Sequence, residues 1–431
     1  MLHLFFYHIF LAVYWAGVRI VGIQNKKARA WIIGRFNWKL KLQTAVANLP
    51  KRAIGKKPQT VWMHCSSLGE FEQGRPVIEK LKAQDPSIIV IVSFFSPSGY
   101  EVMKNYSGAE VVCYLPMDSP VNAGDFISTI NPTMVLWVKY EYWFYYLQEI
   151  HRRNIPLLLI SGIFRPDQPF FKWHGKLHRQ MLPFFSHLFV QNQASKALTE
   201  KIIPAEKISI SGDTRFDRVM SIAEKFEPLP IIENWIGNTT KVVVAGSTWD
   251  EDEKILTHYT KLHPEIKFII APHNINELEI KDVVKLFPEA SLFSTLTKNN
   301  IAGEIPANSH TLIIDNVGML ARLYHYATIA YIGGGFGNDG VHNVLEAAVY
   351  NKPVIHGPEY EKFAEAKGLI ETGGAFEIAD ALELEEVMDK LFTDEAFYKT
   401  SAMAAGTFVY TQQGPTLKVV DYIYINRLLT S

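Results

Sequence analysis

Acidic side chains are absent from the first 69 residues of this sequence, although the same stretch holds eleven lysine or arginine side chains. The first acid is Glu70, and the chain from there onward carries 32 basic against 44 acidic side chains. The formal net charge of −1 thus conceals a basic N-terminal region and an acidic remainder. This asymmetry predicts that the N-terminal region meets something anionic: a membrane surface, a phosphorylated substrate or a nucleic acid.

Cysteine is scarce as well. Cys65 and Cys113 are too few for a disulfide framework and lack the spacing of a metal site, which suits a reducing cytosol. The composition is 48% hydrophobic and 13% aromatic, which excludes global disorder. A chain of 431 residues is long for one core, so two domains of roughly 200 residues each are expected.

The first 18 residues carry no charge and include the run LFFYHIFLAVYW, which approaches the ~20 residues of a spanning helix. Basic residues follow the run from Arg19 onward and do not precede it, so it is not typical of a secretory signal. We expect residues 1–45 to associate with membrane lipids, with the basic side in the cytoplasm, and residues 1–24 to contribute little to either sheet. A buried core helix beside a solvated basic face is the alternative, and spanning or lying on the membrane is left open.

Basic and apolar side chains alternate between Lys26 and Lys41. Trp31, Phe36 and Trp38 are among the apolar residues of this stretch. The pattern predicts an interfacial helix more than a linker.

Short apolar runs alternate with helical stretches along the rest of the chain. The segment Ile88–Phe95 is almost continuously apolar, which is typical of a parallel strand covered on both faces. The other expected strands are Thr60–Cys65, Val111–Leu115, Met134–Val138, Pro156–Ile160, His187–Gln191, Ile208–Ile210, Lys241–Thr248, Lys267–His273, Thr311–Asp315, Ile329–Ile332 and Pro353–Gly357. This order predicts an α/β fold with two doubly wound parallel sheets and ligands at the carboxyl ends of the strands.

Two prolines mark the expected boundary between the domains. The segment Ala223–Pro230 contains EKFEPLP and breaks the periodicity. We therefore expect a membrane-associating segment over residues 1–45, an N-terminal domain over 46–222 and a C-terminal domain over 223–431. The last helices are candidates for packing back on the N-terminal domain.

The stretch Tyr331–Pro358 is expected to hold a cofactor or a donor, because it reads as strand, glycine loop, helix and strand. Its glycines allow a sharp turn and a close approach to a ligand. A helix that begins near His342 or Asn343 would offer free N–H groups to an anion. Glu346, one turn further along this helix, would face the same anion site and reach a sugar hydroxyl.

Two other interpretations of this stretch remain open. Gly335-Phe-Gly337-Asn-Asp-Gly340 is a G-x-G-x-x-G pattern, and Glu359 and Glu361 follow at about the spacing of a ribose ligand, which favours a dinucleotide. Such a pattern usually opens the first βαβ unit of its domain, whereas several units precede it here. The other interpretation is a glycine turn that only joins a strand to a helix.

Seven short motifs occur in a fixed order. They are His64-Cys-Ser-Ser-Leu-Gly-Glu70, Leu115-Pro-Met-Asp118, Glu141-Tyr-Trp143, Gly212-Asp-Thr-Arg-Phe-Asp217, Ala245-Gly-Ser-Thr248, Asp315-Asn-Val-Gly318, and His342-Asn343-Val-Leu-Glu346-Ala-Ala with Lys352-Pro-Val-Ile-His-Gly-Pro358. In this order and spacing the sequence resembles the 3-deoxy-D-manno-octulosonic acid (Kdo) transferases of lipid A biosynthesis. The resemblance runs from Met1 to about Asp394.

The resemblance implies two Rossmann-like domains facing a cleft, the GT-B architecture, and an inverting glycosyltransferase. A Kdo residue would move from CMP-Kdo, a co-substrate, to a hydroxyl of the acylated, phosphorylated glucosamine disaccharide that is the lipid A precursor. The reaction would take place at the cytoplasmic face of the bacterial inner membrane. It would use no metal and no other cofactor, and the protein would have no nucleic-acid partner.

The resemblance also implies roles for the acceptor side. Glu70 would be the general base, with a pKa that needs little increase because a helix start and the upstream basic residues favour the ionised form. In the alternative, Ser67 and Glu70 form a capping box. The acceptor-binding residues would be Ser67, Gly69, Arg75, Asp118 and Glu141. Arg75 is equally a surface side chain in this pattern, and Asp118 and Glu141 are equally helix caps.

On the donor side, the phosphate would leave from a positive environment supplied by Arg215 and by the helix start at His342 and Asn343. The donor-binding residues would be Arg215, Ser247, Thr248, Pro272, His273, Gly318, Gly334, Gly335, His342, Asn343 and Glu346. The chain departs from the family pattern at His273, where an arginine is usual, and at Arg165, which is displaced by two residues.

Other functions remain open at this point. A UDP-sugar transferase or epimerase of the same architecture would use a similar glycine loop and glutamate. A membrane-bound scaffold with a vestigial nucleotide site and a nicotinamide oxidoreductase are the further alternatives.

Overall fold

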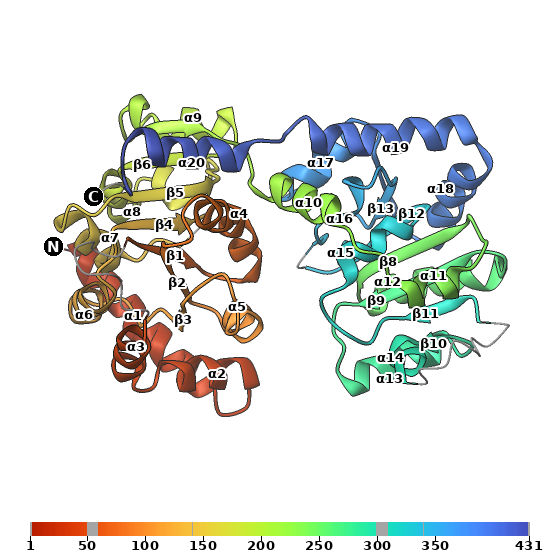
Figure 1. Cartoon of the computed structure of the whole chain (residues 1–431), viewed down its shortest axis with the longest axis horizontal. Helices are drawn as coiled ribbons and strands as arrows, with labels where there is room; N and C mark the ends of the chain where they lie inside the picture. Colours follow the sequence, from red (N-terminus) through yellow and green to blue (C-terminus); the bar gives the residue numbers. More distant parts are fainter. Residues whose placement is uncertain (1, 50–58, 140, 299–308, 339, 430–431) are drawn as a thin grey trace. The chain divides into compact units, whose positions relative to one another are not determined.

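The computed structural model describes residues 2–49, 59–139, 141–298, 309–338 and 340–429. The chain forms two compact units. The first comprises Met1–Arg218 and Gly414–Ser431, and the second comprises Val219–Gln413. Each unit contains a seven-stranded sheet with helices packed against it (Figure 1). The predicted fold class, α/β with two parallel sheets, is confirmed.

The first sheet has the strand order β3-β2-β1-β4-β5-β6-β7, and its paired strands are all parallel. Its strands are β1 (Thr60–Cys65), β2 (Ile89–Phe94), β3 (Val111–Tyr114), β4 (Met134–Val138), β5 (Leu157–Gly162), β6 (His187–Val190) and β7 (Ile208–Ile210). Every residue of β1, β2, β4, β5 and β6 is buried. Such burial is expected of parallel strands that are covered on both faces.

Helices cover both faces of this sheet. One face carries α4 (Leu68–Gln84), α5 (Pro97–Met103) and α20 (Pro415–Ile425). The other carries α1 (Leu2–Val21), α2 (Lys26–Arg35), α3 (Trp38–Ala47), α6 (Pro120–Ile130) and α7 (Phe144–Arg152). The remaining helices of this unit are α8 (Lys176–Met181), α9 (Gln193–Thr199) and α10 (Arg215–Glu224), which continues into the second unit.

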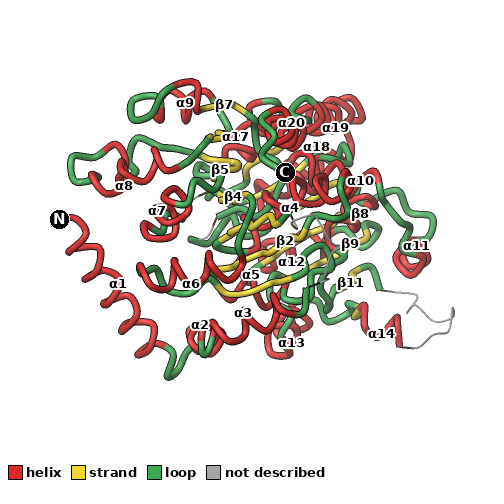
Figure 2. Tube along the Cα trace, turned by 60° about the vertical axis from the view of Figure 1, so that its left-hand side comes forward, coloured by secondary structure: helices red, strands yellow, loops and turns green. Residues whose placement is uncertain are grey.

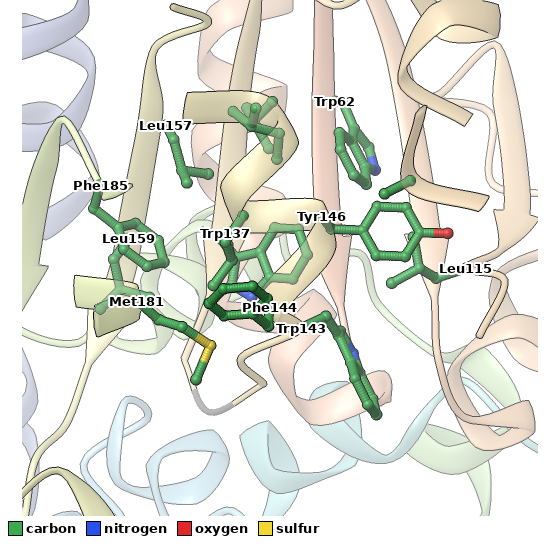
Figure 3. Close-up of a cluster of buried hydrophobic side chains, with 14 of the residues drawn as sticks. Trp62, Leu115, Trp137, Trp143, Phe144, Tyr146, Leu157, Leu159, Met181 and Phe185 are labelled. Atoms are coloured by element: carbon green, nitrogen blue, oxygen red, sulfur yellow. The ribbon is translucent and has the colours of Figure 1, made fainter. Parts of the chain in front are cut away.

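Aromatic rings fill the core on the second of these faces. Figure 3 shows Trp62 of β1, Trp137 of β4 and Tyr146 of α7 close together. The ring of Trp62 meets the other two edge-on, with centroids 5.7 Å from Trp137 and 6.1 Å from Tyr146. Edge-to-face pairs add to the stabilisation that apolar burial gives. The cluster therefore fixes the positions of β1 and β4, and with them the starts of the loops that follow these strands.

The second sheet has the order β10-β11-β9-β8-β12-β13-β14, again with parallel pairs. Its strands are β8 (Val242–Thr248), β9 (Lys267–Pro272), β10 (Ser291–Leu292), β11 (Thr311–Ile313), β12 (Ile329–Ile332), β13 (Val354–His356) and β14 (Ala375–Glu377). Its helices are α11 (Pro230–Ile236), α12 (Asp250–Leu262), α13 (Glu277–Leu286), α14 (Phe293–Lys298), α15 (Leu320–Leu323), α16 (Leu345–Ala348), α17 (Ala364–Glu371), α18 (Ala381–Thr393) and α19 (Glu395–Tyr410).

All the predicted strands are present, with ends within two residues of the expected ones. The short strands β10 and β14 were not expected, because neither Ser291–Leu292 nor Ala375–Glu377 is a continuous apolar run. The expected interfacial helix over Lys26–Lys41 is divided into α2 and α3 at Asn37, whose φ of 52° ends one helix before the next begins. The units divide at 218/219 and not at 222/223, and residues 414–431 belong to the first unit.

Helix α1 lies at the edge of the first unit (Figure 2), and one of its sides packs on the core. Tyr7, Leu11 and Tyr14 pack one side of the helix into the aromatic core. Phe6 and Phe10 of the same helix expose more than half of their surface, although the ring of Phe10 also lies beside those of Tyr7 and Tyr14. The expectation that residues 1–24 contribute little to either sheet is therefore wrong. A helix that is rich in aromatic residues on all sides can pack one side on the protein core and still expose apolar side chains on another.

Asp118 anchors this helix. The Tyr7 hydroxyl donates to Asp118 Oδ2 at 2.6 Å and accepts from the backbone N–H of Phe144 at 3.3 Å. The same carboxylate accepts from the backbone N–H groups of Tyr145 and Tyr146, at 2.9 and 3.1 Å, and so caps the start of α7. Burial raises the pKa of Asp118 to about 6.

We predict that Tyr7→Phe lowers the free energy of unfolding by about 1–3 kcal/mol, because it removes the hydroxyl from a mostly buried carboxylate and from a backbone donor. Phe6→Ser changes an exposed position of the same helix and is expected to stay within about 0.5 kcal/mol. Urea unfolding in mild detergent measures both. Equal stabilities for Tyr7→Phe and the wild type would contradict the anchoring role.

Candidate functional site

The order of the first sheet reverses between β1 and β4. In folds of this kind, ligands bind beside the carboxyl ends of the strands at such a switch point. The loop after β1 leads into α4 and carries Ser66, Ser67 and Glu70. Glu141 lies beyond the end of β4 and before α7. The sheet thus brings the predicted base and a predicted acceptor ligand to the same switch point.

Glu70 is buried in the first turn of α4, with 7% of its surface exposed. Its carboxylate accepts a hydrogen bond from the backbone N–H of Ser66. The Ser67 side chain makes no capping bond, so the reciprocal capping box is not complete. Burial and then the charge of Glu141 raise the pKa of Glu70 to about 8, against the backbone hydrogen bonds that lower it. The expectation of a nearly ordinary pKa is therefore wrong, because desolvation outweighs the helix start.

Glu141 is the centre of a hydrogen-bond network. Its carboxylate accepts from Ser66 Oγ at 2.7 Å and from Trp143 Nε1 at 3.1 Å, and it lies 3.0 Å from His64 Nε2. His64 Nδ1 is in turn 2.9 Å from Ser93 Oγ. Ser66 therefore links the two carboxylates, with its N–H to Glu70 and its hydroxyl to Glu141.

Sequence reasoning missed His64, Ser66 and Ser93 as members of this network. His64 and Ser93 lie inside fully buried strands, where a pattern of apolar residues draws attention away from them. The available signal was a polar residue inside a buried strand, since such a residue needs a partner.

The other predicted acceptor residues divide into two groups. Ser67 and Gly69 lie at the start of α4 beside Glu70, and Gly69 has open space where a side chain would project. Arg75 is paired with Glu79 at 2.7 Å and with Glu72 at 3.3 Å on the same helix. Asp118 caps α7 and binds Tyr7, as described above. The structure therefore brings Ser67, Gly69, Glu70 and Glu141 together and gives Arg75 and Asp118 other partners.

Arg215, a predicted donor ligand, lies in the first unit. Its Nε and Nη2 atoms donate to Asp213 Oδ2, at 3.0 and 2.7 Å. The Gln73 and Gln191 amides donate to the same carboxylate. These partners hold Arg215 at the first turn of α10, and the charge of Arg215 is the main factor that lowers the pKa of buried Asp213.

The order of the second sheet reverses between β8 and β12. Gly333, Gly334 and Gly335 follow β12, and a side chain at any of them would collide with neighbouring atoms of the protein. At Gly333 the neighbour is the backbone of Ser247, and at Gly335 it is the backbone of Gly357. These glycines thus allow close packing of one loop against another, where we had expected them to admit a ligand.

Three aromatic rings meet at this switch point. The indole Nε1 of Trp249 donates to His342 Nε2 at 3.1 Å, and the two rings are nearly coplanar, with an interplanar angle of 4°. The ring of His273 stacks on both, with centroids 4.5 Å from Trp249 and 4.6 Å from His342. Trp249 was not among the predicted site residues.

The expected helix at His342 or Asn343 begins instead at Leu345 and is only four residues long. Asn343 precedes it and donates from Nδ2 to Glu346 Oε1 at 3.0 Å. A helix of one turn has few aligned peptide dipoles, so it attracts an anion less than the expected longer helix would.

The remaining predicted donor residues lie at strand ends or turns of the second unit. Thr248 Oγ1 donates to Glu253 Oε1 at 2.9 Å, and burial raises the pKa of Glu253 to about 7. Ser247 and Gly318 adopt positive φ, and Pro272 ends β9. Asp339, inside the glycine-rich segment, lies outside the described residues. Among the residues that are described, no group of three His, Cys, Asp or Glu side chains is arranged to hold a metal ion.

Several known proteins are similar to this chain in sequence or in fold. A family model described as 3-deoxy-D-manno-octulosonic-acid transferase (kdotransferase) matches residues 37–218. The Kdo transferase of Haemophilus influenzae is 26% identical over 340 residues, 76% of this chain and 78% of that protein. The Kdo transferase of Aquifex aeolicus is 25% identical over 353 residues, 80% of this chain and 89% of that protein. This chain is a homologue of the Kdo transferases.

These matches support a glycosyltransferase. Among solved structures, the UDP-GlcNAc 2-epimerase of Neisseria meningitidis superposes with a TM-score of 0.59 at 17% identity. It covers 86% of this Kdo transferase homologue and all of the epimerase chain. That likeness establishes the GT-B fold.

We predict that Glu70→Gln stabilises the protein at neutral pH. The folded state holds the proton up to about pH 8, whereas the unfolded carboxyl releases it near its ordinary pKa of 4.5, so wild-type stability falls across that window. The advantage of the glutamine variant should be absent at pH 4 and should grow by about 1.4 kcal/mol per pH unit up to pH 8.

Urea unfolding at pH 4, 6 and 8 measures this effect. Glu206→Gln removes an exposed carboxylate of the same unit and serves as the control, with no such pH dependence expected. A pH-independent difference for Glu70→Gln would mean that Glu70 is ionised in the folded protein.

Proposed function

We propose that this Kdo transferase homologue is an inverting glycosyltransferase that moves Kdo from CMP-Kdo to a hydroxyl of the lipid A precursor. The observation that carries the proposal is Glu70, a buried carboxylate at the switch point of the first sheet, within the residues that the family model matches. The Kdo transferase relatives support the identity of the sugar.

Glu70 is suited to the acceptor step. An alcohol is a poor nucleophile unless a base takes its proton as attack proceeds, and a base works best with a pKa near the working pH. Burial and the neighbouring Glu141 give Glu70 a pKa of about 8. The N–H of Ser66 stabilises the ionised form, so the deprotonated fraction remains useful at neutral pH. Ser67 and Gly69, at the open start of α4, would contact the acceptor.

The donor would bind at the carboxyl edge of the second sheet, where Ser247, Thr248, His273, His342 and Asn343 lie. Departure of a phosphate is aided by hydrogen-bond donors that are already oriented. Glu346 would hold the ribose hydroxyls. The transfer displaces one oxygen by another without redox chemistry, so we propose that it needs no metal and no further cofactor.

Membrane association is the second part of this proposal. Helices α1 to α3 expose large apolar side chains, among them Phe6, Phe10, Ile20, Phe36 and Leu40. The same region carries the basic residues and no acid. The segment His3–Val21 is long and apolar enough to cross a bilayer, but one of its sides packs on the first unit. We therefore propose that α1 lies in the surface of the cytoplasmic leaflet of the inner membrane.

We predict that Glu70→Gln lowers transfer by roughly 10²–10⁴-fold, the usual contribution of a positioned general base. The glutamine keeps the shape and the hydrogen bond to Ser66, so folding and CMP binding should persist. The protein is incubated with CMP-Kdo and a tetra-acylated disaccharide, with and without EDTA. Mass spectrometry then measures how much of the lipid has gained the mass of a Kdo residue. Glu206→Gln is the matched control and should keep the wild-type rate.

Wild-type transfer by Glu70→Gln would remove Glu70 from the mechanism. Transfer from a UDP-sugar, with none from CMP-Kdo, would favour the alternative of a UDP-sugar transferase or epimerase. Loss of transfer in EDTA would contradict the metal-free reaction.

We predict that the double variant Phe6→Ser/Phe10→Ser reduces flotation with anionic lipid vesicles several-fold while the protein stays folded, because both side chains expose more than half of their surface. Tyr7→Phe changes a side chain that binds Asp118 and should lower stability while the protein still floats. Unchanged flotation of the double variant would exclude this side of α1 as the membrane contact.

A further inference from the structure

The coplanar pair of Trp249 and His342 constrains the chemistry of the histidine. An indole N–H only donates, so His342 Nε2 must accept and carries no proton while this bond exists. A neutral imidazole then holds its proton on Nδ1. An imidazolium has no acceptor and would have to give up the bond to Trp249. A positively charged His342 is therefore incompatible with this hydrogen bond.

The surrounding backbone is built to keep the pair in place. Asp252 Oδ2 accepts from the backbone N–H of Trp249 and from that of Gly334, both at 2.9 Å. The Tyr331 hydroxyl donates to Asp252 Oδ1 at 2.7 Å. One buried carboxylate thus joins the segment that carries Trp249 to the loop that leads to His342.

Gly334 makes room for the ring. A Cβ at this residue would lie 2.8 Å from His342 Cδ2 and 3.2 Å from Nε2, which is too close for any side chain. The backbone N–H of His342 donates to Gly333 O at 3.1 Å. Gly334 thus packs against the edge of the imidazole that carries Nε2, and Gly333 holds the backbone of His342.

We propose that Trp249 is a positioning residue of the donor site, which holds His342 as a neutral imidazole with its proton on Nδ1. The inference rests on the proposed function for its ligand, a nucleoside monophosphate group. His342 then acts on that group as an oriented neutral donor, with no charge of its own. His273, stacked on both rings, occupies the position of the family's arginine.

Nitrogen-15 NMR of histidine-labelled protein at pH 7.5 tests the tautomer directly, with His342 assigned through His342→Gln. The wild type is expected to show a proton on Nδ1. Trp249→Phe keeps a ring for His273 to stack on but removes the N–H, so Nε2 should become protonated in a measurable fraction of molecules. Trp235→Phe is the matched control, because the buried Nε1 of Trp235 has no hydrogen-bond partner in the described part of the chain.

Calorimetric titration with CMP tests the consequence for the donor. Trp249→Phe should weaken CMP binding by about 2- to 10-fold, the effect of one lost orienting hydrogen bond. Trp235→Phe should leave both the tautomer and CMP affinity unchanged.

A proton on Nε2 in the wild type would overturn the inference, and so would an unchanged tautomer in Trp249→Phe. The wild-type tautomer is measured without Trp249→Phe, so misfolding of Trp249→Phe would leave this first test intact. The expected tautomers together with no CMP binding by the wild type would contradict the proposed donor site, and the control of His342 by Trp249 would remain.

Discussion

Burial of both faces of each parallel sheet is the constraint on which the rest of this structure depends. No residue of β1 or β2 reaches water, so a polar side chain within these strands must find its partner inside the protein. His64 and Ser93 do so with each other. The remaining polar chemistry is confined to the strand ends, where loops meet solvent and where the order of each sheet reverses.

The two units use their switch points in a similar physical way. In the first, Ser66 joins Glu70 and Glu141, two carboxylates from the loops after adjacent strands. In the second, Trp249 and His342 come from the loops after adjacent strands and share one hydrogen bond. In both places a neighbouring loop bears on the protonation of a candidate site residue. Burial, and then the charge of Glu141, raises the pKa of Glu70 to about 8, and the indole of Trp249 donates to His342 Nε2.

The N-terminal helix links the proposed membrane contact to the fold of the first unit. Tyr7 binds Asp118, and Asp118 caps α7, which follows Glu141 in the chain. A helix anchored in this way cannot leave the first unit without exposing a buried carboxylate. The apolar side that remains outside is then available to lipid, and the basic residues that follow it are suited to anionic head groups.

The sequence by itself determined the elements and the family. Runs such as Ile88–Phe95 can only be stable where both faces are covered, and the order of the seven motifs identified the relatives before any geometry was known. Composition also located the basic N-terminal region. Apolar runs and motifs depend on neighbouring residues, and charge is a sum over residues, so all of them can be recognised from the sequence alone.

Only the tertiary structure decided which groups are paired and how each titrates. Glu70 followed a capping pattern in the sequence, but its pKa depends on burial and on Glu141, 71 residues away. Trp249 showed no signal as a partner of His342, because 93 residues separate them and only the pairing of β8 with β12 brings them together. Desolvation and hydrogen bonding act through space at distances of a few ångströms, and the chain order does not specify which distant residues will lie that close.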